Sequence, residues 1–415
     1  MVRKVFFWIH LTAGAVAGVV ILIMSVTGAL LAFEPQVLRH LERGSRQVTP
    51  PASLPERLSP EALLSRALAA RPASRPASIT LDADPRVAAL VGLGREDVLF
   101  LDPYTGAVTG EGSKAGREFF HVVTDWHRFL GLHGDARATG KAVTGASNAA
   151  FLFLSLSGVY LWWPRQWTWR HVRPVVAFQG GLGGKARDFN WHNVFGLWCA
   201  PVIFFLTLTA LLISYPAVGN AVFPLQTPGG APAGAPRPDG AAARGPRPTQ
   251  ERGDGRTEAP LTPDAFAGLD GAWAAARERV PGWTLAVLRL PRQGGPVTVA
   301  ITASSWRSPY GRSQLSYDPG KREVAKWEPF AEFPKGRKTR TAARWLHTGE
   351  ILSWPGQAAA GVASLGGAFL VWTGLALALR RLRAWRQSST QRNRAVAMAA
   401  NAPTASGQAA SRESA

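Results

Sequence analysis

Four long stretches of the sequence contain no Asp, Glu, Lys or Arg. They cover residues 5–33, 142–163, 189–215 and 351–379. A stretch of about 18 or more apolar residues is long enough to cross roughly 30 Å of hydrocarbon, because a helix rises about 1.5 Å per residue. One such stretch would also fit a buried helix of a soluble protein. Four of them, in a chain with 16 Trp and 19 Phe, predict four membrane-spanning helices.

The first apolar stretch also has a feature of a secretion signal, since Arg3 and Lys4 precede it. It is too long for the apolar core of a signal peptide, however. It also runs into Glu34 and Pro35 and not into a small-residue cleavage site. We therefore interpret residues 1–33 as a retained first transmembrane helix.

Basic residues gather beside the apolar stretches at residues 3–4, 165–187 and 380–386. Helices that alternate in direction bring these three places to one face of the membrane. Short loops rich in Lys and Arg stay in the cytoplasm, so both termini are expected there. Topology then accounts for the net charge of +20. Membrane lipid is an expected partner, and nucleic acid is not.

Two larger segments remain on the opposite side of the membrane, and both show a helix, two strands and a turn in that order. In the first segment Ser59 is suited to the helix N-cap and Pro60 to the first helical position. The repeated order predicts a protein built from two related halves. The signals lie at residues 59–68, 78–81, 97–101 and 102–106, and again at 262–279, 283–290, 297–302 and 317–320.

The expected fold class is an α-helical membrane protein with four transmembrane helices in two pseudo-repeat halves and two α+β domains outside the membrane. Residues 227–260 are rich in Pro, Gly, Ala and Arg, which predicts a flexible insert. The predicted segments are helix 1 (1–33), domain 1 (34–117), an interfacial segment with helix 2 (118–164), a cytoplasmic loop (165–188), helix 3 (189–215), domain 2 (216–344), an interfacial segment with helix 4 (345–383) and a disordered tail (384–415).

Four of the eight histidines share a local setting, because a Trp lies within two residues before each of them and a Gly follows. They are His10, His127, His192 and His347. His10 and His192 each precede the outer end of their helix by about one full crossing at about 1.5 Å per residue. His127 and His347 lie further from the inner ends of theirs, and Gly-rich breaks follow them. We therefore expect one pair at the inner face of the membrane and one at the outer face.

Ionisable residues inside a membrane are costly and are functional candidates. Two histidines from facing helices can ligate a haem iron from both sides. Small residues beside them give a flat ring room, and Gly14, Gly18, Gly196 and Ala200 lie near the faces that carry His10 and His192. The chain has one cysteine, Cys199, so the Cys-x-x-Cys-His run of a covalent haem is absent and any haem is of b type.

Two other interpretations of the histidines stay open. Each histidine can be neutral and hydrogen-bond a neighbouring helix or an interfacial water. Zinc needs three or four protein ligands, which would require His121 or His133 to join His127 and His347. No His-Glu-x-x-His run is present, which argues against a zinc protease.

The chain resembles the PepSY-associated transmembrane family of bacterial inner-membrane proteins. The matching pieces run in the family's order over most of residues 1–386, although Leu208-Thr209-Ala210 replaces the usual Thr-Gly and Asn193 stands where Arg is common. They are Ser25-Val26-Thr27-Gly28, the turn at 102–106, Asp125-Trp126-His127-Arg128, the run at 156–164, Trp191-His192-Asn193 and Leu346-His347-Thr348-Gly349.

The resemblance implies periplasmic PepSY-like domains, an association with iron uptake and, as in ferric-siderophore reductases, two b-type haems. Its helix-start histidines fall on His10, His127, His192 and His347, with His133 as a substitute ligand. The expected function is therefore that of a dihaem oxidoreductase that reduces a ferric siderophore or other iron chelate. Arg128 and Arg344 are expected to contact haem propionates, an anionic chelate or lipid headgroups.

Electrons would come from a quinol or a cytoplasmic reductase, because the chain has no flavin or nicotinamide motif. One alternative function is a membrane-anchored PepSY module that binds a peptide or a protease. Another is a small-molecule permease, although the apolar stretches lack the carboxylates that ion coupling uses.

Overall fold

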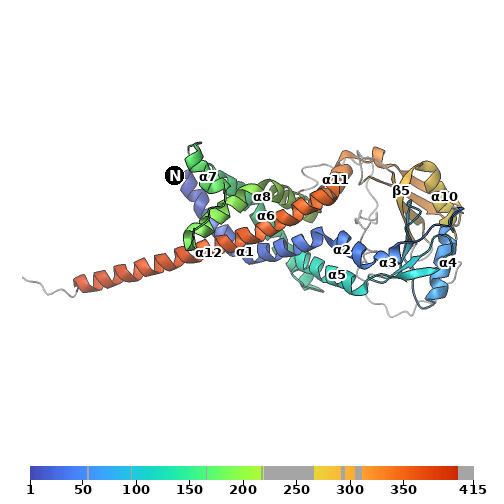
Figure 1. Ribbon diagram of the computed structural model, residues 1–415, viewed down its shortest axis with the longest axis horizontal. Coiled ribbons are helices and arrows are strands. Elements are labelled where there is room, and N and C mark those ends of the chain that lie inside the picture. The colour runs from blue at the N-terminus through green and yellow to red at the C-terminus, as the bar shows by residue number, and fades with distance from the viewer. Residues whose placement is uncertain are drawn as a thin grey trace, which may run out of the picture.

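The computed structural model describes residues 1–53, 56–94, 96–164, 166–215, 218, 266–290, 295–303 and 311–400. Figure 1 shows a bundle of long helices that leads into a β-sheet at one end. We call this end of the bundle the sheet side and the other end the far side. The predicted insert at 227–260, the helix start at 262–264 and the tail at 401–415 lie outside the described residues.

In the part of the chain that the structure describes, four helices are long and apolar enough to cross a membrane, as the charge-free stretches predicted. α12 packs along α1 and α8, and α6 packs along the same two helices. α1 and α8 therefore stand at opposite corners of a four-helix bundle. Their bounds are α1 Val2–Ala32, α6 Ala136–Trp162, α8 Gly184–Ser214 and α12 Ser353–Ala400.

α12 is longer than expected, and the prediction of a disordered tail from residue 384 is wrong as far as Ala400. Figure 1 shows this helix extending past the other three on the far side. Residues 384–400 contain no Gly or Pro and several good helix formers such as Ala, Arg, Gln and Met. Extending an existing helix is much easier than starting one, so the membrane helix continues after its apolar part ends.

Shorter helices connect the bundle to the sheet. The chain turns sharply after α5, where Leu130 and Gly131 have φ values of 55° and 69°, and after α11, where Gly349 has a φ of 76°. These turns are the predicted breaks before the second and fourth membrane helices. The connecting helices are α2 Glu34–Leu41, α3 Arg43–Arg46, α5 Lys114–Phe129, α11 Lys335–His347, and the 3₁₀ turns η2 Phe330–Glu332 and η3 Glu350–Leu352. A further short helix, α7 Trp169–Val176, lies on the far side, in the segment between α6 and α8 (Figure 1).

The strands form one antiparallel sheet in the order β4-β3-β2-β1-β5-β6-β7-β8. Each of the two segments outside the membrane contributes four consecutive strands, and β1 pairs with β5 at the centre. The bounds are β1 Ser78–Asp82, β2 Ala89–Gly92, β3 Val98–Leu101, β4 Val108–Glu111, β5 Trp283–Arg289, β6 Val297–Ala303, β7 Arg312–Asp318 and β8 Glu323–Glu328.

The sequence suggested two separate domains, and this prediction is wrong, because the two segments share one sheet. Their edge strands β1 and β5 pair over five residues, from Ser78 opposite Arg289 to Asp82 opposite Leu285. Two separate sheets would have left both edges with unpaired backbone groups, which is a liability for a strand. Joining them satisfies these groups and merges the two apolar faces.

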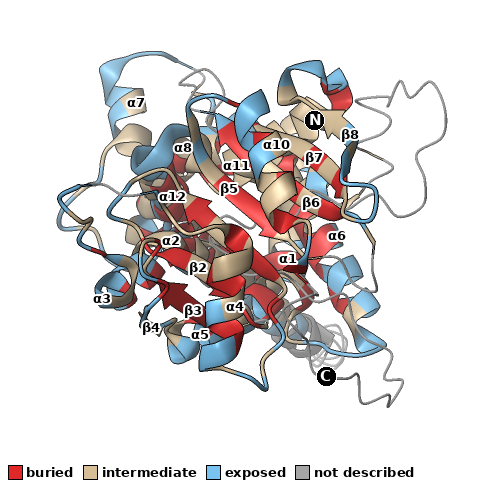
Figure 2. Cartoon of the chain, turned by 90° about the vertical axis from the view of Figure 1, so that its right-hand side faces the viewer, coloured by how far each residue is buried: buried red, intermediate tan, exposed pale blue. Residues whose placement is uncertain are grey.

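The merged core lies between the sheet and two helices, α4 Pro60–Ala70 and α10 Leu269–Arg279. Ser59 caps α4 as predicted, since its side chain accepts the Ala62 N–H. Figure 2 shows α4 and α10 lying over the buried strands. Fully buried side chains from both halves meet here, including Leu64, Leu269, Leu288 and Ile301.

Candidate functional site

The four predicted histidines lie in two pairs. His10 of α1 and His192 of α8 have ring centroids 6.4 Å apart and planes at 86°. His127, in the last turn of α5, and His347, at the end of α11, also have centroids 6.4 Å apart, with planes at 48°. We call the first the far pair and the second the sheet-side pair. These are the pairs that the helix directions predicted.

Both histidines of the far pair are held by hydroxyl groups of the neighbouring helices. His10 Nδ1 lies 2.8 Å from Ser157 Oγ of α6. His192 Nδ1 lies 3.0 Å from Thr373 Oγ1 of α12. Each ring is therefore fixed by a helix that carries neither member of the pair.

The sheet-side pair is held in a similar way, with one difference. His127 Nδ1 lies 2.9 Å from Thr27 Oγ1 of α1. His347 Nδ1 donates to the Leu206 carbonyl oxygen of α8 at 2.9 Å, and Thr209 Oγ1 lies farther away, at 3.4 Å. All four Nδ1 atoms thus have a partner on a membrane helix.

These contacts favour the tautomer that carries its proton on Nδ1. A hydroxyl has one hydrogen, and each of the three hydroxyls that meets a histidine closely donates it to a carbonyl of its own helix. A hydroxyl oxygen whose hydrogen is engaged in this way accepts the Nδ1–H, and Nε2 is then the unprotonated ring nitrogen. The three bonds are Ser157 to Phe153 at 2.7 Å, Thr373 to Phe369 at 2.8 Å and Thr27 to Ile23 at 2.6 Å.

A glycine follows each of these three hydroxyl residues and leaves room for the histidine ring. A Cβ at any of them would approach Cε1, the ring carbon next to Nδ1. The distances would be 3.5 Å from Gly158 to His10, 3.4 Å from Gly374 to His192 and 3.3 Å from Gly28 to His127. The Ser/Thr-Gly pair therefore forms a cradle that orients the ring and lies against it, and an added Cβ would be tight at Gly28 but in ordinary contact at Gly158 and Gly374.

A metal held between two imidazoles sets the distance between their rings. A metal–nitrogen bond is about 2 Å long, and Nε2 lies about 1.2 Å from the centre of a ring whose bonds are about 1.35 Å. Opposite ligands of one metal thus have ring centres about 6.3 Å apart. Both pairs match this value at 6.4 Å. Fixing Nδ1 with a hydrogen bond is also the usual way to orient a metal-binding histidine.

A pair of histidines with no third ligand would suit a haem iron better than zinc, which needs three or four protein ligands. Among the described residues no group of three or more His, Cys, Asp or Glu gathers as a metal site would require. His133 is exposed in the turn after α5. His121 lies 3.5 Å from Asp125 and 3.7 Å from Glu96. Neither histidine completes a set of three with the sheet-side pair.

Other predicted site residues lie in the same helices as the paired histidines. The Arg128 guanidinium lies over the Phe129 ring at 5.0 Å, and Arg344 lies one turn before His347 on α11. Of the small residues expected to line a ring, Gly14 lies against Leu154. Gly18 lies against Leu375 and Gly196 against Leu370, and Ala200 is buried.

The hydroxyl partners were missed by the sequence analysis. The signal was nevertheless present, because Thr27-Gly28, Ser157-Gly158 and Thr373-Gly374 each place a Ser/Thr-Gly pair in one membrane helix. The fourth helix has Thr209-Ala210 at the corresponding place. The pair alone does not single out Ser157, because α6 also contains Thr139-Gly140 and Thr144-Gly145.

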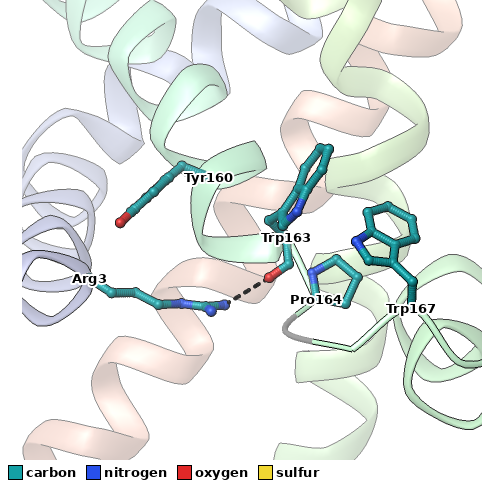
Figure 3. Close-up of a pocket in the computed structure, with 5 residues that line it drawn as sticks. All are labelled: Arg3, Tyr160, Trp163, Pro164 and Trp167. Atoms are coloured by element: carbon teal, nitrogen blue, oxygen red, sulfur yellow. Dashed lines mark hydrogen bonds between the residues drawn. The ribbon is translucent and has the colours of Figure 1, made fainter.

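A hollow in the protein surface lies on the far side, and Figure 3 shows its lining. Arg3 donates to the Trp163 carbonyl at 3.3 Å and also to the Leu161 carbonyl. Tyr160 lies one turn of α6 beyond Ser157, the partner of His10. The lining consists of Arg3, Tyr160, Trp163, Pro164 and Trp167.

Comparison with known proteins agrees with this architecture. The family model described as PepSY-associated TM region matches residues 7–381, a span that contains all four paired histidines. No curated protein matches the chain. Because the family model covers nearly the whole chain, this multi-pass membrane protein belongs to the PepSY-associated transmembrane family.

Proposed function

We propose that this protein is a dihaem oxidoreductase of the bacterial inner membrane that carries electrons across the membrane to a ferric chelate in the periplasm. The observation that supports this most is the spacing of the two histidine pairs. Both have ring centroids 6.4 Å apart, which fits two axial ligands of one iron, and all four Nδ1 atoms are already engaged.

In this proposal His10 and His192 would hold one b-type haem, and His127 and His347 would hold the other. Haem, when bound, supplies one-electron chemistry whose potential depends on its ligands and their hydrogen bonds. The chain's own contribution is to keep Nε2 unprotonated and aimed at the partner ring. His133 becomes a poor substitute ligand, because it is exposed in a turn and joins no histidine group.

The two pairs lie towards opposite ends of the membrane helices. His10 belongs to the far pair and Thr27, on the same helix α1, holds the sheet-side pair. At about 1.5 Å per residue the two levels are about 25 Å apart along the helix, most of the thickness of the hydrocarbon core. One pair near each surface is the arrangement that electron transfer across a membrane needs.

The charge distribution supports cytoplasmic placement of the far side. The start of α1, the segment around α7 and the basic part of α12 all lie on that side (Figure 1). They carry the three basic clusters of the sequence, including Arg3 and Arg380. By the positive-inside rule this side is cytoplasmic, and the sheet is then periplasmic.

A two-half origin is supported by the order of the elements. Each half has a membrane helix, then a helix and four strands of the sheet, a short helix that ends at or near the paired histidine, and a second membrane helix. The sheet order, with β1 and β5 central and β4 and β8 at the edges, reflects the same relation. We therefore treat the halves as pseudo-repeats.

The proposed substrate is a ferric siderophore or another ferric chelate with hard oxygen ligands. Reduction to ferrous iron weakens such binding, which releases the metal. The donor would be a quinol or a cytoplasmic reductase, and the hollow around Arg3 and Trp167 opens on the side where electrons would enter. Arg128 and Arg344 stay candidates for contacts to propionate groups or to the chelate.

Reconstitution into vesicles tests this function. Vesicles loaded with dithionite are placed in ferric citrate, and a colorimetric ferrous chelator outside reports iron reduction. Wild type and His133→Ala are expected to produce ferrous iron, whereas His10→Ala and His127→Ala match protein-free vesicles. Reduction at the wild-type rate by either paired-histidine variant would overturn the proposal.

A further inference from the structure

The two faces of the sheet differ in character. Side chains at alternate positions of the central strands pack on α4 and α10 and are apolar, such as Leu288, Val299 and Leu315. The positions between them point to the opposite face and are largely polar. On β1, β5, β6 and β7 these are Ser78, Thr80, Asp82, Leu285, Val287, Arg289, Thr298, Ala300, Thr302, Arg312, Gln314 and Ser316.

The helix that carries His347 lies against this polar face. Arg337, in the first turn of α11, donates to Gln314 Oε1 at 2.9 Å and to Glu328 at 3.1 Å. Near the other end of α11, the Arg312 guanidinium lies 5.7 Å from the centre of the Trp345 ring. Trp345 is two residues before His347, so Arg312 links the polar face directly to the segment that presents the sheet-side pair.

Two arginines, Arg289 and Arg312, lie on this face. Arg289 is opposite Thr298, and Arg312 is opposite Thr302, so both point to the same side of the sheet. Burial lowers the pKa of Arg312, the nearby Glu350 opposes this shift, and the positive charge of Arg289 adds to it. Two guanidinium groups on one face, next to the helix that carries His347, suit an anion with more than one carboxylate.

We propose that Arg289 and Arg312 form the recognition site for a negatively charged ferric chelate whose carboxylate oxygens face the sheet. The proposal rests on the function proposed above, since it names where the substrate of the sheet-side pair binds. Arginine presents a planar fork of donors that suits carboxylates. Hydroxyl groups at Ser78 and Thr298, which flank Arg289 in the strand register, suit the remaining oxygens.

Binding of gallium(III) citrate to the full-length protein in detergent tests the site. Gallium(III) has the charge and size of ferric iron but is not reduced here, so binding is measured apart from electron transfer. Calorimetry is expected to show that Arg289→Gln and Arg312→Gln each weaken binding by about tenfold or more, since each removes a charge-assisted contact. Arg312→Lys, which keeps the charge but loses the fork, is expected to be intermediate.

The matched control is Arg279→Gln, which removes the same charge from α10 on the other side of the sheet. It should bind like wild type. A neutral gallium(III) complex of three acetohydroxamates is the control ligand, and the arginine substitutions should not change its binding. Equal gallium citrate affinity in wild type and both variants would overturn the proposal.

Absorption spectra of the same samples separate this proposal from the general one. If Arg312→Gln loses haem, the arginine serves a haem propionate and the chelate site is wrong. If no sample contains haem, the electron-transfer function is wrong. The arginine site is then judged separately, by whether the two arginine substitutions weaken gallium citrate binding in the calorimeter. Normal haem content with weakened binding is the expected result.

Discussion

Ala210 of α8 occupies the position that Gly28 occupies in α1. The same interval along the chain separates Thr27 from His10 and Thr209 from His192. A Cβ at Gly28 would come within 3.3 Å of the His127 ring. α8 carries a methyl group at this place, and His347 bonds to the Leu206 carbonyl at 2.9 Å, with the Thr209 hydroxyl at 3.4 Å.

This relationship predicts opposite effects of two single substitutions. Gly28→Ala should push the His127 ring away from Thr27, and Ala210→Gly should let His347 approach Thr209. Both change the angle between the two imidazole planes of the sheet-side pair, which is 48°. Electron paramagnetic resonance of the oxidised protein is the measurement, since low-spin haem signals depend on that angle.

The far pair serves as the internal control, because its planes stand at 86° and neither substitution touches it. We expect two distinct low-spin signals in wild type, of which one shifts in each variant. Identical spectra in all three proteins would show that the residue after the threonine does not set the ring orientation.

Loss of a hydroxyl partner should weaken cofactor binding at one pair alone. Ser157→Ala removes the acceptor of His10 Nδ1, and loss of such an outer-shell partner usually costs about 10- to 100-fold in metal affinity. Haem titration of the purified variant measures this loss. Ser157→Thr should restore binding, and Ser155→Ala, two residues away on the same helix, should leave it unchanged. Wild-type affinity in Ser157→Ala would contradict the role assigned to this hydroxyl.

The single continuous sheet can be tested with a cross-link. Thr80 is opposite Val287 in the central β1–β5 pair, and directly opposite side chains have Cβ atoms about 4.5–5.5 Å apart. Thr80→Cys with Val287→Cys should form a disulfide under mild oxidation, which mass spectrometry detects. Thr80→Cys with Leu285→Cys is the matched control, since a diagonal pair is about 7–8 Å apart. Equal cross-linking in both would exclude this register.

Asp82 predicts a pH effect on the stability of the sheet. Burial raises the pKa of Asp82, with smaller opposing effects from a backbone hydrogen bond and from Arg57. The folded state therefore prefers the protonated acid. The stability from this group is complete below its unfolded pKa of about 3.9 and is lost as the pH rises through the folded value.

Asp82→Asn cannot ionise, and it should melt at a higher temperature than wild type at pH 7. The difference should shrink towards zero below about pH 4, where wild-type Asp82 is protonated as well. Tryptophan fluorescence during heating measures both melting temperatures. A variant that is less stable than wild type at pH 7 would show that Asp82 is stabilising as a carboxylate.

The membrane part of the fold was predictable from the sequence because a bilayer imposes a length and an apolar character on each helix. The alternating direction of the helices then paired His10 with His192 and His127 with His347, with no tertiary information needed. The hydroxyl cradles were not found, because Ser and Thr inside a membrane helix are common packing residues. Only the contact with a ring from another helix distinguishes Ser157 from Ser155.

The sheet was harder to predict. β3 and β6 are short apolar runs and were recognised, whereas β8 reads Glu-Val-Ala-Lys-Trp-Glu and shows little strand character alone. The pairing of β1 with β5 joins residues some 200 positions apart, and no local pattern reports such a contact. The helical part of the tail was missed because its composition resembles that of the insert and offers little apolar surface to bury, although its residues are good helix formers.

The central claim, two separate haem sites made by the two histidine pairs, is tested most directly by oxidised and dithionite-reduced absorption spectra. Wild type, His10→Ala, His127→Ala and the exposed control His133→Ala are expressed with sufficient haem and compared per mole of protein. The account predicts full haem content in wild type and His133→Ala, and about half in each of the other two. No Soret band in wild type, or loss of all haem from either single substitution, would contradict it.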